Sequence, residues 1–287
     1  MTLRAAVTLL LGLAVLTGGC DDDASDVSAE EIDRYVAMGD SFTSAPGVPV
    51  TDQTTGCLRS DHNYPALLAE SLGLTLVDVS CGSADTTAIE GVQQTPGGPK
   101  PPQLDAVDRT TDLVTVGIGI NDFGLYSSLL FNCPQLAPTD PRGSPCRDSM
   151  ATEGGGDRLR DTIEQIGPRV EAALVAVASK APRARVVLVG YPQFVPESGS
   201  CEALPLATGD YPYLRELGAQ LGAELEQAAE AADADYLDLA EASAGHDICA
   251  GADAWVNGAQ DDPERAVLYH PFPEGQEAVA TLIEDLL

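Results

Sequence analysis

The sequence Tyr35-Val36-Ala37-Met38-Gly39-Asp40-Ser41-Phe42 is a short apolar run that ends at a glycine, with an acidic residue and a serine directly after it. In an α/β protein this order predicts a buried strand that ends in a tight turn, with Ser41 at the start of the next helix. A serine at the carboxyl end of a strand is a candidate nucleophile. Asp and Ser are also common helix caps, so the rest of the chain has to decide between the two interpretations.

The rest of the chain alternates β-rich runs with stretches that are compatible with helix. Strands are expected at 34–38, 75–79, 113–118, 185–190 and 235–239, and helices at 64–72, 102–110, 157–180, 211–232 and 274–287. Near-continuous apolar strands are typical of a parallel sheet that is covered on both faces. The pattern predicts a doubly wound α/β fold with five parallel strands, whose ligand site lies at the carboxyl ends of the strands.

One long segment, 123–156, does not fit this alternation. It is rich in Pro and Gly and carries Cys133 and Cys146. We expect it to be irregular, and long irregular segments inside a compact domain are usually functional or disordered. A disulfide within the segment would favour an ordered wall or lid.

The composition indicates one acidic globular domain behind an N-terminal leader. The 287 residues include 45 acidic and 15 basic ones, a formal net charge of −30, which argues against nucleic acid or an anionic membrane as an electrostatic partner. Residues 1–19 combine Arg4 with an apolar run at 5–16 that is too short for a stable membrane anchor, and so predict a signal peptide. Residues 20–33 are expected to be a flexible tether, and 34–287 the folded domain, as a monomer.

The first cysteine, Cys20, has a different predicted role from the other six. It follows small residues behind the apolar run and resembles the lipidated cysteine of bacterial lipoproteins, although Thr17 stands where leucine is usual. The resemblance implies a lipid anchor that holds the protein on the outer face of the bacterial cell membrane, with plain secretion as the alternative.

The other cysteines predict disulfides, because an even number in an exported chain is typical of a disulfide framework. Several pairings are possible, of which the sequential one is the simplest. No C-x-x-C pair or His/Cys cluster is present, so no metal site is expected. The six residues are Cys57, Cys81, Cys133, Cys146, Cys201 and Cys249.

Polar groups follow other predicted strands and would meet Ser41 at one edge of the sheet. The small-residue turn after the second strand offers the backbone N–H of Gly82 or Ser83, and Asn121 after the third strand offers a side-chain amide. His270, just before the last helix, is a candidate general base. A nucleophile, oxyanion donors and a base are the groups that acyl transfer requires.

These blocks resemble those of the SGNH, or GDSL, hydrolase superfamily: Gly39-Asp40-Ser41, the 82–83 turn, Gly119-x-Asn121-Asp122 and the late His270. Within it, Trp255-Val256-Asn257-Gly258 and His270-Pro271 make the chain similar to secreted actinobacterial lipases and esterases with three disulfides. The resemblance covers about 34–287. It implies a flavodoxin-like α/β/α sandwich, sequential disulfides, and hydrolysis of a lipid or acylated-glycan ester through an acyl-enzyme on Ser41, without a cofactor.

The chain departs from the family pattern at the oxyanion turn. The family's oxyanion glycine usually lies two residues after the cysteine, which is Ser83 here, while Gly82 occupies the position before it. Because the donor is a backbone N–H, a serine can replace glycine where its φ is acceptable. Both residues are therefore candidates, and Ser83 is preferred.

The second departure concerns the histidine block. The usual Asp-x-x-His has Val267 in place of the aspartate. In the lipases that the chain most resembles, a backbone carbonyl orients the histidine, so we expect a Ser41–His270 dyad with a histidine pKa near its ordinary value of about 6.5. A triad that uses Asp261 or Asp262 is the alternative.

Two other functions are alternatives to this prediction. An envelope polysaccharide O-deacetylase would share the site, and a non-catalytic lipoprotein binding module would not need Ser, Asn and His together. His62 and His246 are expected to be surface residues. Trp255 and Tyr269 could line an acyl pocket or belong to the core.

Overall fold

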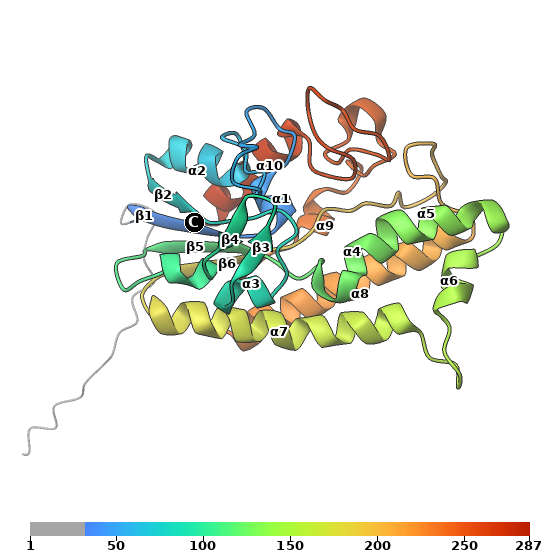
Figure 1. Cartoon of the computed structure of the whole chain (residues 1–287), viewed down its shortest axis with the longest axis horizontal. Helices are drawn as coiled ribbons and strands as arrows, with labels where there is room; N and C mark the ends of the chain where they lie inside the picture. Colours follow the sequence, from blue (N-terminus) through green and yellow to red (C-terminus); the bar gives the residue numbers. More distant parts are fainter. Residues whose placement is uncertain (1–31) are drawn as a thin grey trace, which may run out of the picture.

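A parallel sheet of five strands, in the order β2-β1-β5-β6-β7, forms the centre of the molecule in a computed structural model that describes residues 32–287 (Figure 1). The predicted signal peptide, Cys20 and nearly all of the predicted tether lie outside the described residues. The strands are β1 (Arg34–Gly39), β2 (Thr75–Asp78), β5 (Leu113–Gly117), β6 (Arg185–Val189) and β7 (Asp235–Leu237).

The alternation of side chains along the strands determines which helices cover which face. On β1, Tyr35 and Ala37 pack on one side with α2 (Tyr64–Leu72) and α10 (Pro273–Leu286). Val36 and Met38 point to the other side, toward α7 (Arg158–Lys180) and α8 (Asp210–Ala231). Figure 1 shows these two helical layers above and below the sheet. The predicted α/β/α sandwich is therefore confirmed.

Two short segments differ from the predicted elements. The helix expected at 102–110 is only the single 3₁₀ turn η2 (Gln103–Ala106), because Val107 returns to an extended conformation and the Asp108 carboxylate accepts the Thr110 N–H at 2.7 Å. The strands β3 (Gln93–Thr95) and β4 (Gly98–Lys100) form a small antiparallel hairpin that was not predicted. Both segments are too short for a periodic pattern to reveal.

The segment 123–156 is mostly helical, so the expectation of an irregular loop was wrong. Proline lies in the first turn of three of its helical elements, as Pro134, Pro138 and Pro145, and this position is favourable because the first turn needs no N–H donor. Leu129 and Leu130 are buried in the core below the sheet. The elements are η3 (Asp122–Gly124), α4 (Leu125–Ser127), the π-helical η4 (Ser128–Asn132), α5 (Cys133–Leu136), η5 (Ala137–Thr139) and α6 (Pro145–Met150).

The six cysteines of the domain are joined in sequential order, the pairing that the resemblance implied. The pairs are Cys57–Cys81, Cys133–Cys146 and Cys201–Cys249. The second bridge joins α5 to α6 and makes the segment 123–156 an ordered wall. None of the described helices is long and apolar enough to cross a membrane.

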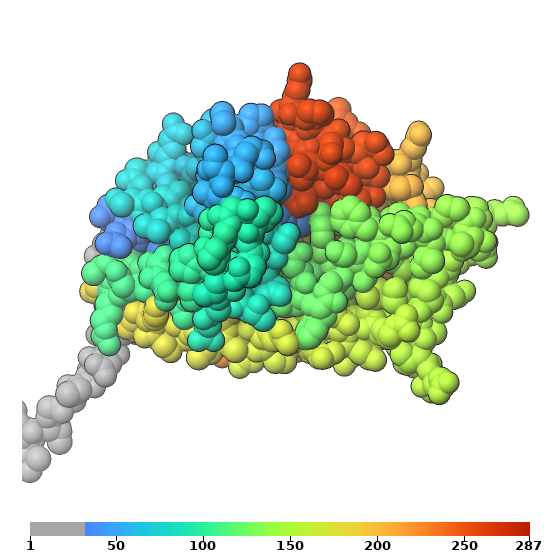
Figure 2. Space-filling view, viewed as in Figure 1, coloured from blue at the N-terminus to red at the C-terminus, as the bar shows by residue number. Residues whose placement is uncertain are grey.

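Two remote parts of the chain meet at the surface beside the sheet edge. Figure 2 shows the blue segment that follows β1 next to the red C-terminal segment. A backbone hydrogen bond from Val267 N–H to the Pro46 carbonyl, 3.2 Å long, joins them. The contact brings the chain around His270 to the carboxyl end of β1.

Candidate active site

Ser41 is the first residue of the short helix α1 (Ser41–Ser44), directly after β1. The Asp40 carboxylate caps this helix by accepting the Phe42 N–H at 2.8 Å. Gly39 has a φ of +153°, and a Cβ there would lie 2.3 Å from Thr43 Oγ1 and 2.6 Å from the Gly117 carbonyl oxygen, so only glycine fits. The helix cap is Asp40 and the candidate nucleophile is the next residue, Ser41, so the two interpretations of this sequence are compatible.

A buried chain of hydrogen bonds joins the Ser41 turn to the end of β5. Tyr191 Oη donates to Asp40 Oδ2 at 2.6 Å and accepts the Ile120 N–H at 3.1 Å. Asp40 is fully buried, and this burial raises the pKa of its carboxyl group to about 7 although the hydrogen bonds from Tyr191 and Phe42 lower it. Tyr191 therefore couples the position of Ser41 to that of the neighbouring Asn121.

Gln103 holds the same turn from the other side. Its Oε1 accepts the Gly39 N–H at 2.7 Å, and its Nε2 donates to the Gly39 carbonyl at 2.9 Å. The side chain is buried. Neither Gln103 nor Tyr191 was identified from the sequence, because no local pattern marks a side chain that bonds to a glycine 64 residues away or to an aspartate 151 residues away.

The two candidate turn donors differ in what their N–H groups contact. The Gly82 N–H donates to the Cys57 carbonyl at 2.8 Å, whereas the N–H groups of Ser83 and Ser41 have no acceptor among residues 32–287. Ser83 has a φ of 61°, a left-handed conformation that glycine adopts more easily. The serine thus has the backbone conformation that the family's glycine would favour.

Asn121 is partly exposed at the end of the same edge. Its Nδ2 donates to the Ala84 carbonyl at 2.9 Å, which fixes the orientation of the side chain. A primary amide carries two N–H donors, so one remains for a ligand. The contact also ties Asn121 to the turn that contains Ser83.

His270 is held through its Nδ1, which lies 2.8 Å from the Leu268 carbonyl oxygen. A carbonyl only accepts, so Nδ1 carries the proton and Nε2 is the free acceptor. The ring stacks on Phe42, the residue after Ser41, with ring centroids 5.7 Å apart. The structure thus places an imidazole acceptor beside the Ser41 turn.

Neither candidate aspartate contacts the His270 ring. Asp261 Oδ1 accepts the Leu268 N–H at 2.9 Å, and Asp262 Oδ1 accepts the Glu264 N–H at 3.1 Å. Burial lowers the pKa of His270 to about 4, although the hydrogen bond to Leu268 and the charge of Asp261 raise it. The expectation of an ordinary histidine pKa was therefore wrong, because the sequence does not reveal how deeply the ring lies.

The loop around His270 is organised by a buried asparagine. Asn257 N–H donates to the His270 carbonyl at 2.9 Å. Its side-chain Nδ2 lies 2.8, 3.0 and 3.2 Å from the carbonyl oxygens of Gln260, Ala266 and Val267, which share its two N–H groups. The sequence identified Asn257 only as part of a motif and gave it no role.

Tyr126 supports the same loop from the helix α4. Its hydroxyl donates to the Tyr269 carbonyl at 3.2 Å and lies 3.4 Å from His270 Nδ1. Tyr269 has a φ of 60° and a buried side chain, so it belongs to the core.

The remaining candidates lie apart from the catalytic edge. His62 is exposed and pairs with Asp61 at 2.6 Å. His246 stacks on Trp255 with ring centroids 4.3 Å apart and lies 2.6 Å from the Asp253 carbonyl, so it is a structural residue that is only partly exposed.

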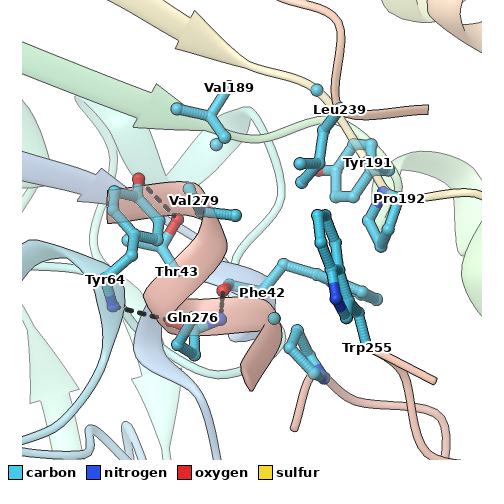
Figure 3. Close-up of a pocket in the computed structure, with 14 residues that line it drawn as sticks. Phe42, Thr43, Tyr64, Val189, Tyr191, Pro192, Leu239, Trp255, Gln276 and Val279 are labelled. Atoms are coloured by element: carbon cyan, nitrogen blue, oxygen red, sulfur yellow. Dashed lines mark hydrogen bonds between the residues drawn. The ribbon is translucent and has the colours of Figure 1, made fainter. Parts of the chain in front are cut away.

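Trp255 lines a small apolar pocket beside α1 (Figure 3). In this pocket Gln276 of α10 accepts the Tyr64 N–H at 2.7 Å and donates to the Phe42 carbonyl at 3.1 Å. The cavity volume of about 20 Å³ holds roughly one water molecule, which is too little for an acyl chain.

Residues 37–278 match the GDSL-like Lipase/Acylhydrolase family. The chain belongs to this family. Similar curated proteins agree with the GDSL-family assignment. The chain is 37% identical to Lipase 2 of Streptomyces coelicolor, over 100% of this chain and 95% of that protein. It is 30% identical to an esterase of Streptomyces scabiei, over 98% of this chain and 92% of that protein.

Two solved structures are similar to this GDSL-family domain over nearly their whole length. Phospholipase A1 from Streptomyces albidoflavus has a TM-score of 0.72 at 26% identity, covering 88% of this chain and 99% of that one. The extracellular lipase from Streptomyces rimosus has a TM-score of 0.73 at 27% identity, covering 89% and 100%. The chain is accordingly a carboxylic ester hydrolase of the lipase and esterase type, as the sequence predicted.

Proposed function

We propose that Ser41 and His270 form a catalytic dyad that hydrolyses carboxylic esters through a covalent acyl-enzyme. The observation that carries the proposal is the hydrogen bond between His270 Nδ1 and the Leu268 carbonyl. It leaves Nε2 unprotonated and therefore able to accept the serine proton. A main-chain carbonyl takes the orienting role that a carboxylate has in a triad.

In the first half of the reaction, Ser41 Oγ attacks the ester carbonyl carbon and its proton passes to His270 Nε2. The carbonyl oxygen becomes an oxyanion, which accepts hydrogen bonds from Ser41 N–H, Ser83 N–H and the Asn121 amide. The imidazolium then protonates the leaving alcohol as the C–O bond breaks. Water repeats the cycle on the acyl-enzyme, so that the carboxylic acid leaves and Ser41 recovers its proton.

Ser83 is the better choice than Gly82 as a turn donor, because the Gly82 N–H is already engaged by the Cys57 carbonyl. Each donor contributes roughly 10²–10³ to the rate when it points at the developing charge. The low pKa of His270 keeps the imidazole neutral at neutral pH, and it also makes the imidazole a weaker base than one whose pKa lies near the working pH.

For the substrate, we propose fatty acyl esters of the lipid type in preference to acetylated glycans. The relatives at 26–37% identity are named lipases, an esterase and a phospholipase A1. The structures of carbohydrate esterases that match this fold are no more than 16% identical, so their substrates carry no argument here.

We further propose that the domain acts outside the cell as a monomer, tethered to the membrane by a lipid on Cys20. The small residues before Cys20 and the three disulfides of the domain support this location. Mass analysis of the mature N-terminus tests the anchor: a modified cysteine at position 20 is expected, and an unmodified N-terminus in the medium would refute it.

A fluorophosphonate probe tests the nucleophile. The native enzyme should be labelled, and Ser41→Ala should lose labelling and at least about 10⁴ of its kcat. Ser44→Ala is the matched control, because the Ser44 Oγ is buried without a hydrogen-bond partner in the described structure. A folded native protein that takes up no probe would support the non-catalytic binding module instead. Comparing nitrophenyl esters of increasing chain length with acetylated xylan separates lipid from glycan esters.

A further inference from the structure

A second pocket lies against α8 and shares the wall residues Tyr191 and Pro192 with the small cavity next to α1. It is enclosed by η4, by the chain that leaves β6 at 191–195, and by one face of α8, and its volume is about 250 Å³. The deep part is apolar, with buried residues such as Leu130, Leu221 and Leu225. A concave, mostly apolar cavity with a few polar groups is the usual form of a small-molecule site.

The pocket is separated from the catalytic edge. Ser41, Ser83, Asn121 and His270 do not line it. Tyr191, which is hydrogen-bonded to Asp40, and Phe194, whose ring meets Phe42 edge-on at 5.6 Å, belong to the wall between the two. The lining residues that are exposed, Gly218 and Ala219, belong to α8, so the mouth opens along that helix.

One cation, Arg215, lines the pocket without a carboxylate partner. It is half-buried, and its Nη1 donates to the Pro196 carbonyl at 2.8 Å. No carboxylate of the described residues lies within 4.0 Å of it. The positions three and four residues away on α8 are the uncharged Tyr211, Pro212, Gly218 and Ala219.

This arrangement is unexpected in a chain with 45 acidic and 15 basic residues. A guanidinium surrounded by so many carboxylates would be expected to pair with one of them. Its remaining N–H groups have no acceptor in the described part of the chain. They are positioned for an anion at the end of an apolar pocket, and a guanidinium binds carboxylate in a two-pronged geometry.

We propose that this pocket binds a free fatty acid, with the alkyl chain between η4 and α8 and the carboxylate on Arg215. The buried leucines would remove the alkyl chain from water, which favours binding. If the proposed function holds, a fatty acid is also the acid product of the enzyme, and the pocket retains it at a distance from Ser41.

Gly218 provides a direct way to close the pocket. A Cβ built at Gly218 meets no atom within 4 Å, so a leucine fits there without displacing the backbone and occupies the mouth. Leucine also has a higher helix propensity than glycine, so the variant is expected to fold. Ala223→Leu is the matched control, because Ala223 is exposed on the same helix and does not line the pocket.

The test is calorimetric titration of full-length Ser41→Ala protein with decanoate and, separately, with decanol. Decanoate should bind with one site per chain, and adding Gly218→Leu should weaken binding of both ligands at least about tenfold, while Ala223→Leu leaves it unchanged. Arg215→Gln should weaken decanoate about tenfold and leave decanol unaltered, since a hydrogen bond to a charged group contributes on that order. Arg183→Gln, at an exposed remote arginine, is the charge control.

Several results would overturn the proposal: no decanoate binding, binding that Gly218→Leu does not change, or equal losses for decanoate and decanol in Arg215→Gln. A substrate tail that reaches the pocket from Ser41 is the competing explanation. In the enzyme with Ser41 intact, it would make Gly218→Leu lower kcat/KM for nitrophenyl decanoate relative to nitrophenyl acetate, and that outcome also overturns the proposal. Binding in Ser41→Ala does not depend on catalysis, so a failure of the dyad leaves this test intact.

Discussion

Ser41 and His270 are held in place by two regions of different construction. The nucleophile turn, residues 39–44, follows a central strand and is fixed by buried side chains from other elements, chiefly Tyr191 and Gln103. The histidine loop, residues 254–272, has almost no regular structure. It is fixed by bonds to its own carbonyls, through Asn257, and by Tyr126 from α4.

The difference separates two ways of positioning a catalytic group. In the nucleophile turn the sheet determines where the serine lies, and the buried polar groups adjust it. In the histidine loop no strand or helix determines where His270 lies, so a few hydrogen bonds determine its position. We therefore expect loss of the Asn257 side chain, which holds the carbonyls of the histidine loop, to reduce activity more than loss of one polar group around the nucleophile turn.

The largest effect is expected for Asn257→Ala. The change removes the two N–H groups that hold three carbonyls of the loop, so His270 is expected to move relative to Ser41. A misplacement on the order of 1 Å costs roughly 10² in rate. The fall should appear in kcat, measured on a short nitrophenyl ester. Asn132→Ala is the matched control, because Asn132 is exposed and its side chain has no hydrogen bond in the described structure. An unchanged kcat in folded Asn257→Ala would mean that the loop does not depend on this side chain.

A smaller loss of activity is expected for Tyr191→Phe. It leaves Asp40 Oδ2 and the Ile120 N–H without their partner in a buried site, and such groups cost about 1–3 kcal/mol each. The sheet still positions Ser41, so kcat should fall about tenfold while the free energy of unfolding in urea falls by about 2 kcal/mol.

Tyr236→Phe provides the comparison for Tyr191→Phe, because the Tyr236 hydroxyl has no hydrogen-bond partner in residues 32–287. Equal changes in kcat and in the free energy of unfolding for the two substitutions would show that the hydrogen bonds from Tyr191 to Asp40 and Ile120 do not position Ser41. A Tyr191→Phe loss as large as that of Asn257→Ala would contradict the contrast between the two regions.

The same contrast explains what could be predicted from the sequence. Strands, the sheet and the position of Ser41 follow from local apolar runs and from the glycine before Asp40, and these predictions were confirmed for the fold. The helical character of 123–156 could not be predicted, because Pro134 and Pro145 lie in the first turns of helices there, whereas many Pro and Gly residues usually indicate an irregular loop.

The support of the site could not be predicted for another reason. Gln103, Tyr191 and Asn257 act through contacts with main-chain groups or with distant residues. Neither kind of contact produces a periodic pattern in the sequence. The pKa of His270 depends on burial, which is a property of the assembled loop. The choice between Ser83 and Gly82 rests on a hydrogen bond between segments 25 residues apart, Cys57 to Gly82.

The two regions also differ in the pKa of their ionisable groups, His270 in the histidine loop and Asp40 in the nucleophile turn. In the proposed dyad His270 must be neutral to accept a proton, so activity should be lost as the pH falls through its pKa, which burial lowers to about 4. Ring NMR signals that disappear in His270→Gln measure the value directly and distinguish it from Asp40, whose pKa burial raises to about 7. A His270 pKa near 6.5 would mean that the surroundings of the partly exposed ring do not disfavour its charged form.

The smallest effect is expected for Asp261→Asn, and it decides between dyad and triad. The Asp261 carboxylate accepts the Leu268 N–H at 2.9 Å, and an asparagine Oδ1 can accept the same hydrogen bond. The Leu268 carbonyl would still hold His270 Nδ1, so the orientation of the ring does not change. Only the charge of Asp261 is lost, and because this charge raises the pKa of His270, the pKa should fall slightly further.

The kcat of Asp261→Asn should therefore stay within a few-fold of the native value, whereas losing a true triad carboxylate costs roughly 10⁴. Asp262→Asn is the paired control, since Asp262 accepts the Glu264 N–H and has no contact with Leu268. A loss near 10⁴ in Asp261→Asn alone, with folding intact, would show that the carboxylate reaches the imidazole during catalysis. The histidine loop would then rest on a charge after all, and its difference from the nucleophile turn, which has Asp40 beside the serine, would largely disappear.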